Sequence, residues 1–229
     1  MVTENLKKVE KKIESACTRA GRDRNDVTLI AVSKTKPVEM MREAMQCGIV
    51  TFGENKVQEI VEKQTELTEP LDWHMIGHLQ RNKVKQVVGR VKRIHSVDSI
   101  RLAKQIQLES EKRNITSDIL IEVNMAKEES KYGFMPEEVE EAIREISTYP
   151  NVKIHGLMTI APYVENPEQN RPVFRALKKL AVDIKMKNID NVHMNELSMG
   201  MTGDYEVAIE EGATYVRVGT GIFGNRQYL

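Results

Sequence analysis

The chain has 229 residues, 40% of them hydrophobic, and its 34 basic residues balance 34 acidic ones. This length supports one substantial core and falls in the range of single-domain α/β barrels, so we expect residues 1–229 to form one domain. A formal net charge of zero provides no overall field to attract nucleic acid or an anionic membrane, and neither is expected as a partner.

The amino terminus carries charges where a signal peptide would have an apolar core. No stretch approaches the roughly 18 apolar residues that a membrane span requires. A cytoplasmic location is therefore expected.

Short β-branched runs alternate with segments of helical spacing along the whole chain, after a leading helix predicted at 4–20. The eight predicted strands are 28–33, 49–52, 73–77, 93–97, 118–123, 153–159, 193–198 and 214–219. The predicted helices between them are 37–47, 56–67, 79–88, 99–113, 136–147, 168–187 and 205–211. Eight strand–helix alternations favour a parallel (β/α)8 TIM barrel with an extra N-terminal helix. A doubly wound open sheet is the alternative, because periodicity cannot show that a sheet closes.

Lys34 follows the first predicted strand and precedes the helix-start signal Thr35-Lys36-Pro37. In both candidate folds the carboxyl end of a parallel strand faces the ligand site. Apolar surroundings there favour the neutral amine, which can form a Schiff base with an aldehyde. The alternative is a lysine that simply reaches into water. Period-two alternation places Lys36 on the same strand face, so the pattern does not choose between the two lysines.

The loops after the seventh and eighth predicted strands are rich in glycine and hydroxyl groups. They read Ser198-Met199-Gly200-Met201-Thr202-Gly203-Asp204 and Arg217-Val218-Gly219-Thr220-Gly221-Ile222-Phe223-Gly224. Barrels often bind phosphate at these two loops, although such glycines also serve ordinary tight turns. A reactive lysine facing a phosphate site suggests a phosphorylated aldehyde, and pyridoxal 5'-phosphate (PLP) fits that description.

A series of motifs, in a fixed order along almost the whole chain, resembles the motifs of the pyridoxal phosphate homeostasis proteins. The motifs are AVSKTKP (31–37), FGEN (52–55), VQE (57–59), WHMIGHLQRNK (73–83), HSVD (95–98), EESKYG (128–133), HGLMTI (155–160), LSMGMTGD (197–204) and RVGTGIFG (217–224). The resemblance implies a barrel like the amino-terminal domain of alanine racemase. It also implies PLP held as a covalent aldimine on the first lysine of AVSKTKP, which is Lys34.

The resemblance carries further roles onto individual positions. Asn55 would line the cofactor ring, and Arg217 would approach the pyridine nitrogen, keep it unprotonated and weaken the ring as an electron sink. The implied phosphate contacts are Ser198, Gly200, Met201, Thr202, Gly219 and Thr220. One departure is Gly203, where the family often has an acidic residue.

The implied function is a non-catalytic PLP-binding protein that buffers or delivers the cofactor and so affects amino and keto acid metabolism. Its expected partners are PLP and PLP-dependent apoenzymes, and the chain itself is expected to be a monomer or a weak homodimer. A PLP-dependent enzyme such as a weak amino-acid racemase is the alternative. A racemase needs acid–base groups on both faces of the substrate carbon, and the opposing base of alanine racemases comes from a carboxyl-terminal domain. This chain ends five residues after Gly224, so we expect that base to be missing. A Schiff-base aldolase without cofactor is a third reading.

The histidines give little support to a metal site. His74 and His78 are four residues apart, but the segment crosses a strand end and lacks the helix-borne glutamate of a zinc protease motif. His95, His155 and His193 fall within predicted strands, where interior packing is the commoner role. We expect no metal.

Overall fold

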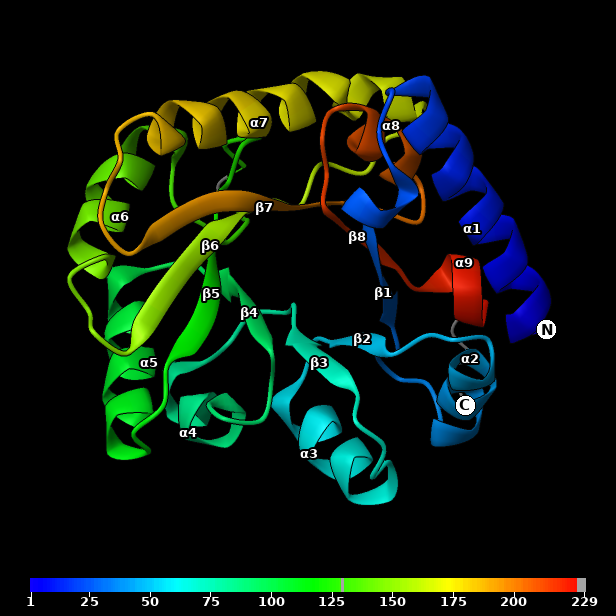
Figure 1. The fold of residues 1–229 in the computed structure, drawn as a ribbon, viewed down its shortest axis with the longest axis horizontal. Helices are drawn as coiled ribbons and strands as arrows, with labels where there is room; N and C mark the ends of the chain where they lie inside the picture. Colours follow the sequence, from blue (N-terminus) through cyan, green and yellow to red (C-terminus); the bar gives the residue numbers. More distant parts are fainter. Residues whose placement is uncertain (129, 226–229) are drawn as a thin grey trace.

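Eight parallel strands close into a barrel in chain order, with helices on the outside (Figure 1). The computed structural model describes residues 1–128 and 130–225. The strands are β1 Thr28–Val32, β2 Thr51–Glu54, β3 Asp72–Met75, β4 Arg93–Val97, β5 Ser117–Glu122, β6 Val152–Met158, β7 Val192–Met201 and β8 Tyr215–Val218. Because β1 pairs with β8 from Thr28↔Tyr215 to Ala31↔Val218, the sheet has no free edge. The predicted barrel is confirmed, and the open sheet is excluded.

The helices follow the predicted alternation. They are α1 Val2–Arg19, α2 Val38–Gln46, α3 Val57–Glu66, α4 Val84–Val87, α5 Ile100–Lys112, α6 Val139–Ile146, α7 Arg171–Lys185, α8 Tyr205–Glu210 and α9 Thr220–Phe223. Short 3-10 turns are η1 Arg24–Asp26, η2 Arg81–Lys83, η3 Pro136–Glu138 and η4 Pro167–Asn170. The segment predicted as a helix at 79–88 is η2 followed by one turn of α4, because Gln80 is extended. Helix α9 was not predicted.

Most strand boundaries differ from prediction by one to three residues, and two of these differences follow from local backbone geometry. β2 begins at Thr51 rather than Ile49, since Gly48 leaves α2 with a φ of +89° and delays the strand. β7 continues to Met201, and its register with β8 shifts between Ser198↔Tyr215 and Met201↔Arg217. Gly200, with a φ of +89°, lies in this bulge. A bulge re-aims the residues that follow it, here the loop leading to α8.

The amino-terminal helix α1 completes the outer helical layer over β8 and β1. α9 is a single turn, and α1 packs against α2, α8 and α9 (Figure 1). Along α1, Leu6, Val9 and Ile13 are buried at three- and four-residue spacing, which makes one apolar face. The extra helix therefore covers barrel surface that α9 is too short to cover.

Apolar side chains fill the middle of the barrel, among them Ile30, Ile76 and Leu120. A Cβ atom on Gly53 would lie 2.7 Å from Ile30 Cγ2, so a glycine is required where β2 crosses this cluster. None of the helices in the described ranges is long and apolar enough to cross a membrane. Glu129, in the EESKYG motif, lies outside the described residues.

Candidate functional site

The predicted site residues lie in the last part of four neighbouring strands or just after them, at the carboxyl end of the barrel. β7, β8, β1 and β2 are adjacent in the closed sheet, so their trailing residues share one rim. Lys34 lies in the turn after β1, and Asn55 follows β2 directly. The residues predicted from the other two strands are Ser198, Gly200, Met201, Thr202, Arg217, Gly219 and Thr220. Barrel closure therefore gathers residues up to 186 positions apart in the chain, from Lys34 to Thr220.

The turn that carries Lys34 is fixed to α3 on both sides of the lysine. Before it, the Ser33 carbonyl oxygen accepts a hydrogen bond of 2.7 Å from Lys63 Nζ. After it, the Thr35 amide donates to Glu59 Oε2 at 2.6 Å. Lys63 Nζ also donates to Glu59 Oε2 at 3.1 Å, which joins the two anchors. The half-buried Lys34 side chain therefore starts from a backbone with little freedom.

Glu54 is the buried carboxylate of this anchor. Its Oε1 accepts from Lys63 Nζ at 2.7 Å and from Ser33 Oγ at 2.6 Å, and the residue is 0% exposed. Burial raises the pKa of Glu54 to about 7, although Lys63 and Ser33 act in the opposite direction. A proton on Glu54 would weaken its ion pair with Lys63, so this anchor is sensitive to pH near neutrality.

Strand alternation does not apply to Lys34 and Lys36, which corrects the expectation that they share a strand face. β1 ends at Val32, and Thr35 takes a φ of +60°, so the strand period does not extend to the lysines. Lys36 Nζ turns toward α9 and donates to the carbonyl oxygens of Phe223 at 3.2 Å and Gly224 at 3.0 Å. Lys36 therefore serves as a C-terminal partner of that helix.

Arg217 is buried inside the barrel and held by one group on β7 and one just after β6. Its Nη1 donates to Ser198 Oγ at 2.5 Å on β7, and its Nη2 donates to the Thr159 carbonyl at 2.8 Å after β6. The residue is 4% exposed. Burial lowers the pKa of Arg217 to about 10, and nearby Glu122 opposes that change. The guanidinium is therefore charged at pH 7 and fixed in direction.

Glu122 is a site residue that sequence reasoning missed. It ends β5, is 6% exposed, and its carboxyl interacts electrostatically with Arg217 and Asp98. Burial first, and then Asp98, raise its pKa to about 7. The available signal was a single acidic residue inside the apolar run Ile119-Leu120-Ile121-Glu122-Val123.

The loop after β7 is shaped by internal contacts. A Cβ on Gly200 would lie 2.5 Å from the Ala208 Cβ, so this glycine allows α8 to approach the strand. The Met201 amide donates to Asp204 Oδ1 at 2.7 Å, and Asn170 Nδ2 donates to Asp204 Oδ2 at 2.8 Å. Asp204 thus holds the backbone that leads to Thr202.

Thr202 joins this loop to the one after β8. Its Oγ1 accepts from the Gly219 and Gly221 amides, each at 3.4 Å. Gly219 is the residue before α9, and Thr220 begins that helix and is exposed. One hydroxyl and two backbone amides therefore converge where the sequence predicted a phosphate site.

Gly203 differs from Gly200 although both lie in the same loop. It is exposed, and a Cβ there would have no neighbour within 4 Å. The structure therefore leaves room for the acidic residue that the family often has at this position, and gives no steric reason for glycine.

A second polar group lies after β3, β4 and β5, as the alignment of strand ends in the sequence predicts. His78 Nδ1 lies 3.0 Å from Asp98 Oδ2, and the Tyr132 ring stacks on His78 with a centroid distance of 3.8 Å. Asn124 Nδ2 donates to the Glu128 carbonyl at 2.8 Å and holds the start of the EESKYG segment. The cluster forms because parallel strands end at one rim, and only the contacts within it required the structure.

His74 and His78 lie in different surroundings. His74 is inside the barrel, where its Nδ1 lies 2.7 Å from His95 Nε2, while His78 is at the rim. Among the residues that the structure describes, no three His, Cys, Asp or Glu side chains are arranged to hold a metal ion.

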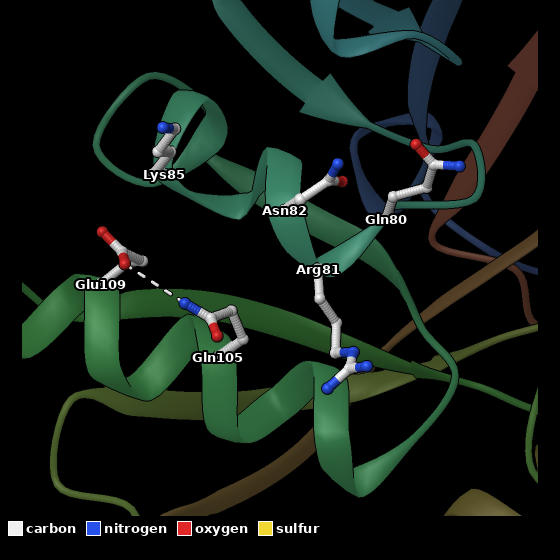
Figure 2. Close-up of a pocket in the computed structure, with 6 residues that line it drawn as sticks. All are labelled: Gln80, Arg81, Asn82, Lys85, Gln105 and Glu109. Carbon is white, nitrogen blue, oxygen red and sulfur yellow. Dashed lines mark hydrogen bonds between the residues drawn. The ribbon is translucent and has the colours of Figure 1, made fainter.

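A surface groove of about 650 Å³ lies outside the barrel, between the η2–α4 segment and α5 (Figure 2). Figure 2 shows Arg81 extending toward α5, and Gln105 Nε2 donating to Glu109 Oε1 at 3.2 Å. None of the predicted site residues lines this groove. A second cavity, of about 430 Å³, borders Thr202 and Asp204 beside α1 and α8.

Comparison with known proteins identifies close relatives over the full length. The alanine racemase, N-terminal domain family matches residues 5–227. A pyridoxal phosphate homeostasis protein of Aquifex aeolicus is 50% identical over 226 residues, covering 98% of each chain. Its namesake in Escherichia coli K12 is 38% identical over 232 residues, covering 99% of this chain and 97% of the relative.

Solved structures agree with the sequence comparison. The structure of PipY of Synechococcus elongatus with PLP bound has a TM-score of 0.83 at 34% identity, covering 98% of this chain and 100% of PipY. An alanine racemase of Clostridium difficile has a TM-score of 0.77 at 14% identity, covering 99% of this chain and 57% of the racemase. The second similarity concerns the fold alone.

Proposed function

The chain belongs to the pyridoxal phosphate homeostasis proteins, a family with the alanine racemase N-terminal-domain fold, and we propose that it binds PLP at the barrel rim and maintains the supply of that cofactor. One observation carries the proposal. Closure of the barrel sets Lys34, the buried Arg217 and the amides around Thr202 on adjacent strands. These are the amine, the cation and the anion-binding donors that PLP requires.

The residues fit both the phosphate group and the ring of the cofactor. The amides of Gly219 and Gly221 donate to the Thr202 hydroxyl at 3.4 Å, contacts long enough for a phosphate oxygen to replace, and the three groups together form a donor set suited to phosphate. Of the other proposed phosphate contacts, Ser198 already serves Arg217, and the Met201 amide already serves Asp204. We therefore expect Thr202, Gly219 and Thr220 to provide most of the phosphate binding, with Gly200 shaping the loop. Asn55 would line the ring beside Lys34.

When bound, PLP supplies an aldehyde that condenses reversibly with amines. We propose Nζ of Lys34 as the amine that holds it covalently, as a Schiff base. The fixation of Ser33 and Thr35 to α3 keeps this amine in one place relative to the rim. Lys36 is occupied with the carbonyl oxygens after α9 and is not proposed as the attachment point.

Arg217 favours a carrier over a catalyst. A guanidinium directed at the pyridine nitrogen opposes protonation of that nitrogen, and an unprotonated ring accepts electrons from a substrate carbanion poorly. We therefore propose a protein without strong catalytic activity that buffers PLP or delivers it to PLP-dependent apoenzymes. Such a role would place it in the cytoplasm with those enzymes.

The test is the visible absorption spectrum of the purified protein with PLP, before and after borohydride, with peptide mapping of the reduced adduct. We expect a yellow adduct trapped on Lys34 and lost in Lys34→Ala. Lys36→Ala is the matched control, since it removes a nearby lysine and should keep the adduct. A protein that takes up no PLP would refute the proposal. An amino-acid turnover that Lys34→Ala abolishes would instead make the protein an enzyme.

A further inference from the structure

Four buried side chains form a continuous hydrogen-bonded chain through the barrel interior. Arg217 Nη1 bonds Ser198 Oγ at 2.5 Å, and Ser198 Oγ lies 2.8 Å from His95 Nδ1. His95 Nε2 continues to His74 Nδ1 at 2.7 Å. The four residues come from β8, β7, β4 and β3, and none is more than 4% exposed.

The direction of these bonds follows from what each group can donate. A guanidinium only donates, so Ser198 Oγ accepts from Arg217. The buried Ser198 hydroxyl must still place its own proton, and His95 Nδ1 is the other hydrogen-bond partner of Oγ within the described ranges. His95 therefore accepts at Nδ1, carries its proton on Nε2 and donates to His74 Nδ1. His74 then also carries its proton on Nε2.

Both histidines are neutral in this arrangement. Burial lowers the pKa of His74 to about 3 and holds the pKa of His95 well below its ordinary value. The Tyr215 ring meets both imidazoles edge-on, with centroid distances of 5.5 Å to His74 and 5.3 Å to His95. The rings are thus confined by packing as well as by hydrogen bonds. A neutral His95 keeps the lone pair on Nδ1 that the Ser198 hydroxyl needs.

We propose that His95, kept in its Nε2–H tautomer by His74, is a positioning residue for Arg217. By accepting the hydrogen bond from the Ser198 hydroxyl, it turns the Ser198 lone pairs toward Nη1, while the Thr159 carbonyl fixes Nη2. The guanidinium is then fixed at two nitrogens in the direction proposed for the cofactor's ring nitrogen. This inference rests on the proposed PLP site, and His95 acts on the cofactor only through Ser198 and Arg217.

The first test compares His95→Asn with His95→Leu. The two replacements have nearly the same shape and leave the same space, but only the asparagine has an oxygen near the position of Nδ1 to accept from Ser198. We expect His95→Leu to bind PLP about tenfold more weakly than His95→Asn, the effect of one buried hydrogen bond. In an Arg217→Met background that difference should fall below about twofold, because the residue being positioned is gone. Equal affinities of the two variants, or a difference that persists without Arg217, would overturn the proposal.

The second test uses the ligand-free wild-type protein and does not depend on cofactor binding or on the folding of a variant. Long-range proton–nitrogen NMR spectra distinguish the two neutral tautomers of each histidine, and the chain has only five histidines to assign. We expect Nε2–H for both His95 and His74. Nδ1–H on His95 would show that Ser198 accepts from it, and would refute the proposed direction. If wild-type protein took up no PLP, the proposed function would fail while these spectra still decided the hydrogen-bond direction.

Discussion

Gly200 and Gly203 show at the residue scale how two glycines in one loop serve different purposes. Gly200 combines a φ of +89° with a prospective Cβ only 2.5 Å from Ala208, so both its backbone and its surroundings require glycine. Gly203 has open space around it. Within LSMGMTGD, the first glycine is thus required by the fold, whereas the second is open to substitution.

We expect Gly200→Ala to lower the free energy of unfolding by at least about 1 kcal/mol, through backbone strain and the clash with α8. Gly203→Ala should change it by less than about 0.5 kcal/mol, as for other surface substitutions. Urea unfolding followed by circular dichroism measures both. Equal effects of the two substitutions would contradict this account of the loop.

Glu122 predicts a pH dependence of stability. Its pKa is raised from 4.5 to about 7 in the folded protein, so folding favours the protonated carboxyl. Its stabilising contribution is therefore complete below pH 4.5 and is lost as the pH rises to about 7, by up to about 3 kcal/mol. Glu122→Gln in the ligand-free protein should remove this part of the loss, so the variant should gain stability over wild type between pH 5 and 8. A constant difference between the two proteins across that range would contradict the prediction.

At the scale of elements, α3 acts as the support for the Lys34 turn. Lys63 reaches from the helix to the Ser33 carbonyl and to Glu54 on β2, and it is only 7% exposed. Removing one partner of a buried ion pair leaves the other charge in a medium that solvates it poorly. The same cation therefore supports both the packing of α3 and the placement of the turn.

Lys63→Met should destabilise the protein by about 3 kcal/mol, because Glu54 loses its cation. Lys112→Met is the matched control. It breaks the ion pair of Lys112 with Glu109 on α5, but the Lys112 side chain is 65% exposed and the expected loss is below about 1 kcal/mol. Thermal unfolding measures both variants. A loss in Lys63→Met no larger than in Lys112→Met would show that the buried pair contributes little.

At the scale of the whole molecule, α1 takes part in the closure of the outer layer. It packs on α2, α8 and α9, and charged contacts such as Arg19 with Glu210 at 2.6 Å tie it to α8. The barrel has no free edge, so a substitution that destabilises one part of it should lower the stability of the whole barrel.

Ile13→Ala should therefore destabilise the entire barrel by about 3 kcal/mol, since Ile13 is 0% exposed and the change leaves a cavity. The only tryptophan, Trp73, is buried on β3 and reports on a different sector. Its fluorescence and the far-ultraviolet circular dichroism should shift to the same lower midpoint, whereas Lys11→Ala on the exposed face should shift neither. Separate midpoints for the two probes would show that α1 detaches independently of the barrel.

The sequence alone determined the fold class and much of the proposed site. Alternating β-branched and helical segments are local properties, and each leaves its period in the chain. The strand ends then predicted that Lys34 and the glycine-rich loops lie at one rim, and the ordered motifs assigned roles to them. Residues such as Asn55 and Thr202 could be named for the same reason, because they occur within contiguous motifs.

Only the tertiary structure decided the rest, because it depends on contacts between strands that are distant in the sequence. Closure between β1 and β8 is such a contact. The bond from the Thr35 amide to Glu59 on α3 is another, at the turn where Thr35 takes a φ of +60°. The buried Glu122 and the bonds joining Arg217 to His95 through Ser198 likewise require side chains from several strands to face one interior. Periodicity shows which face of a strand is buried, but it carries no information on which polar groups meet there or which of them donates the proton.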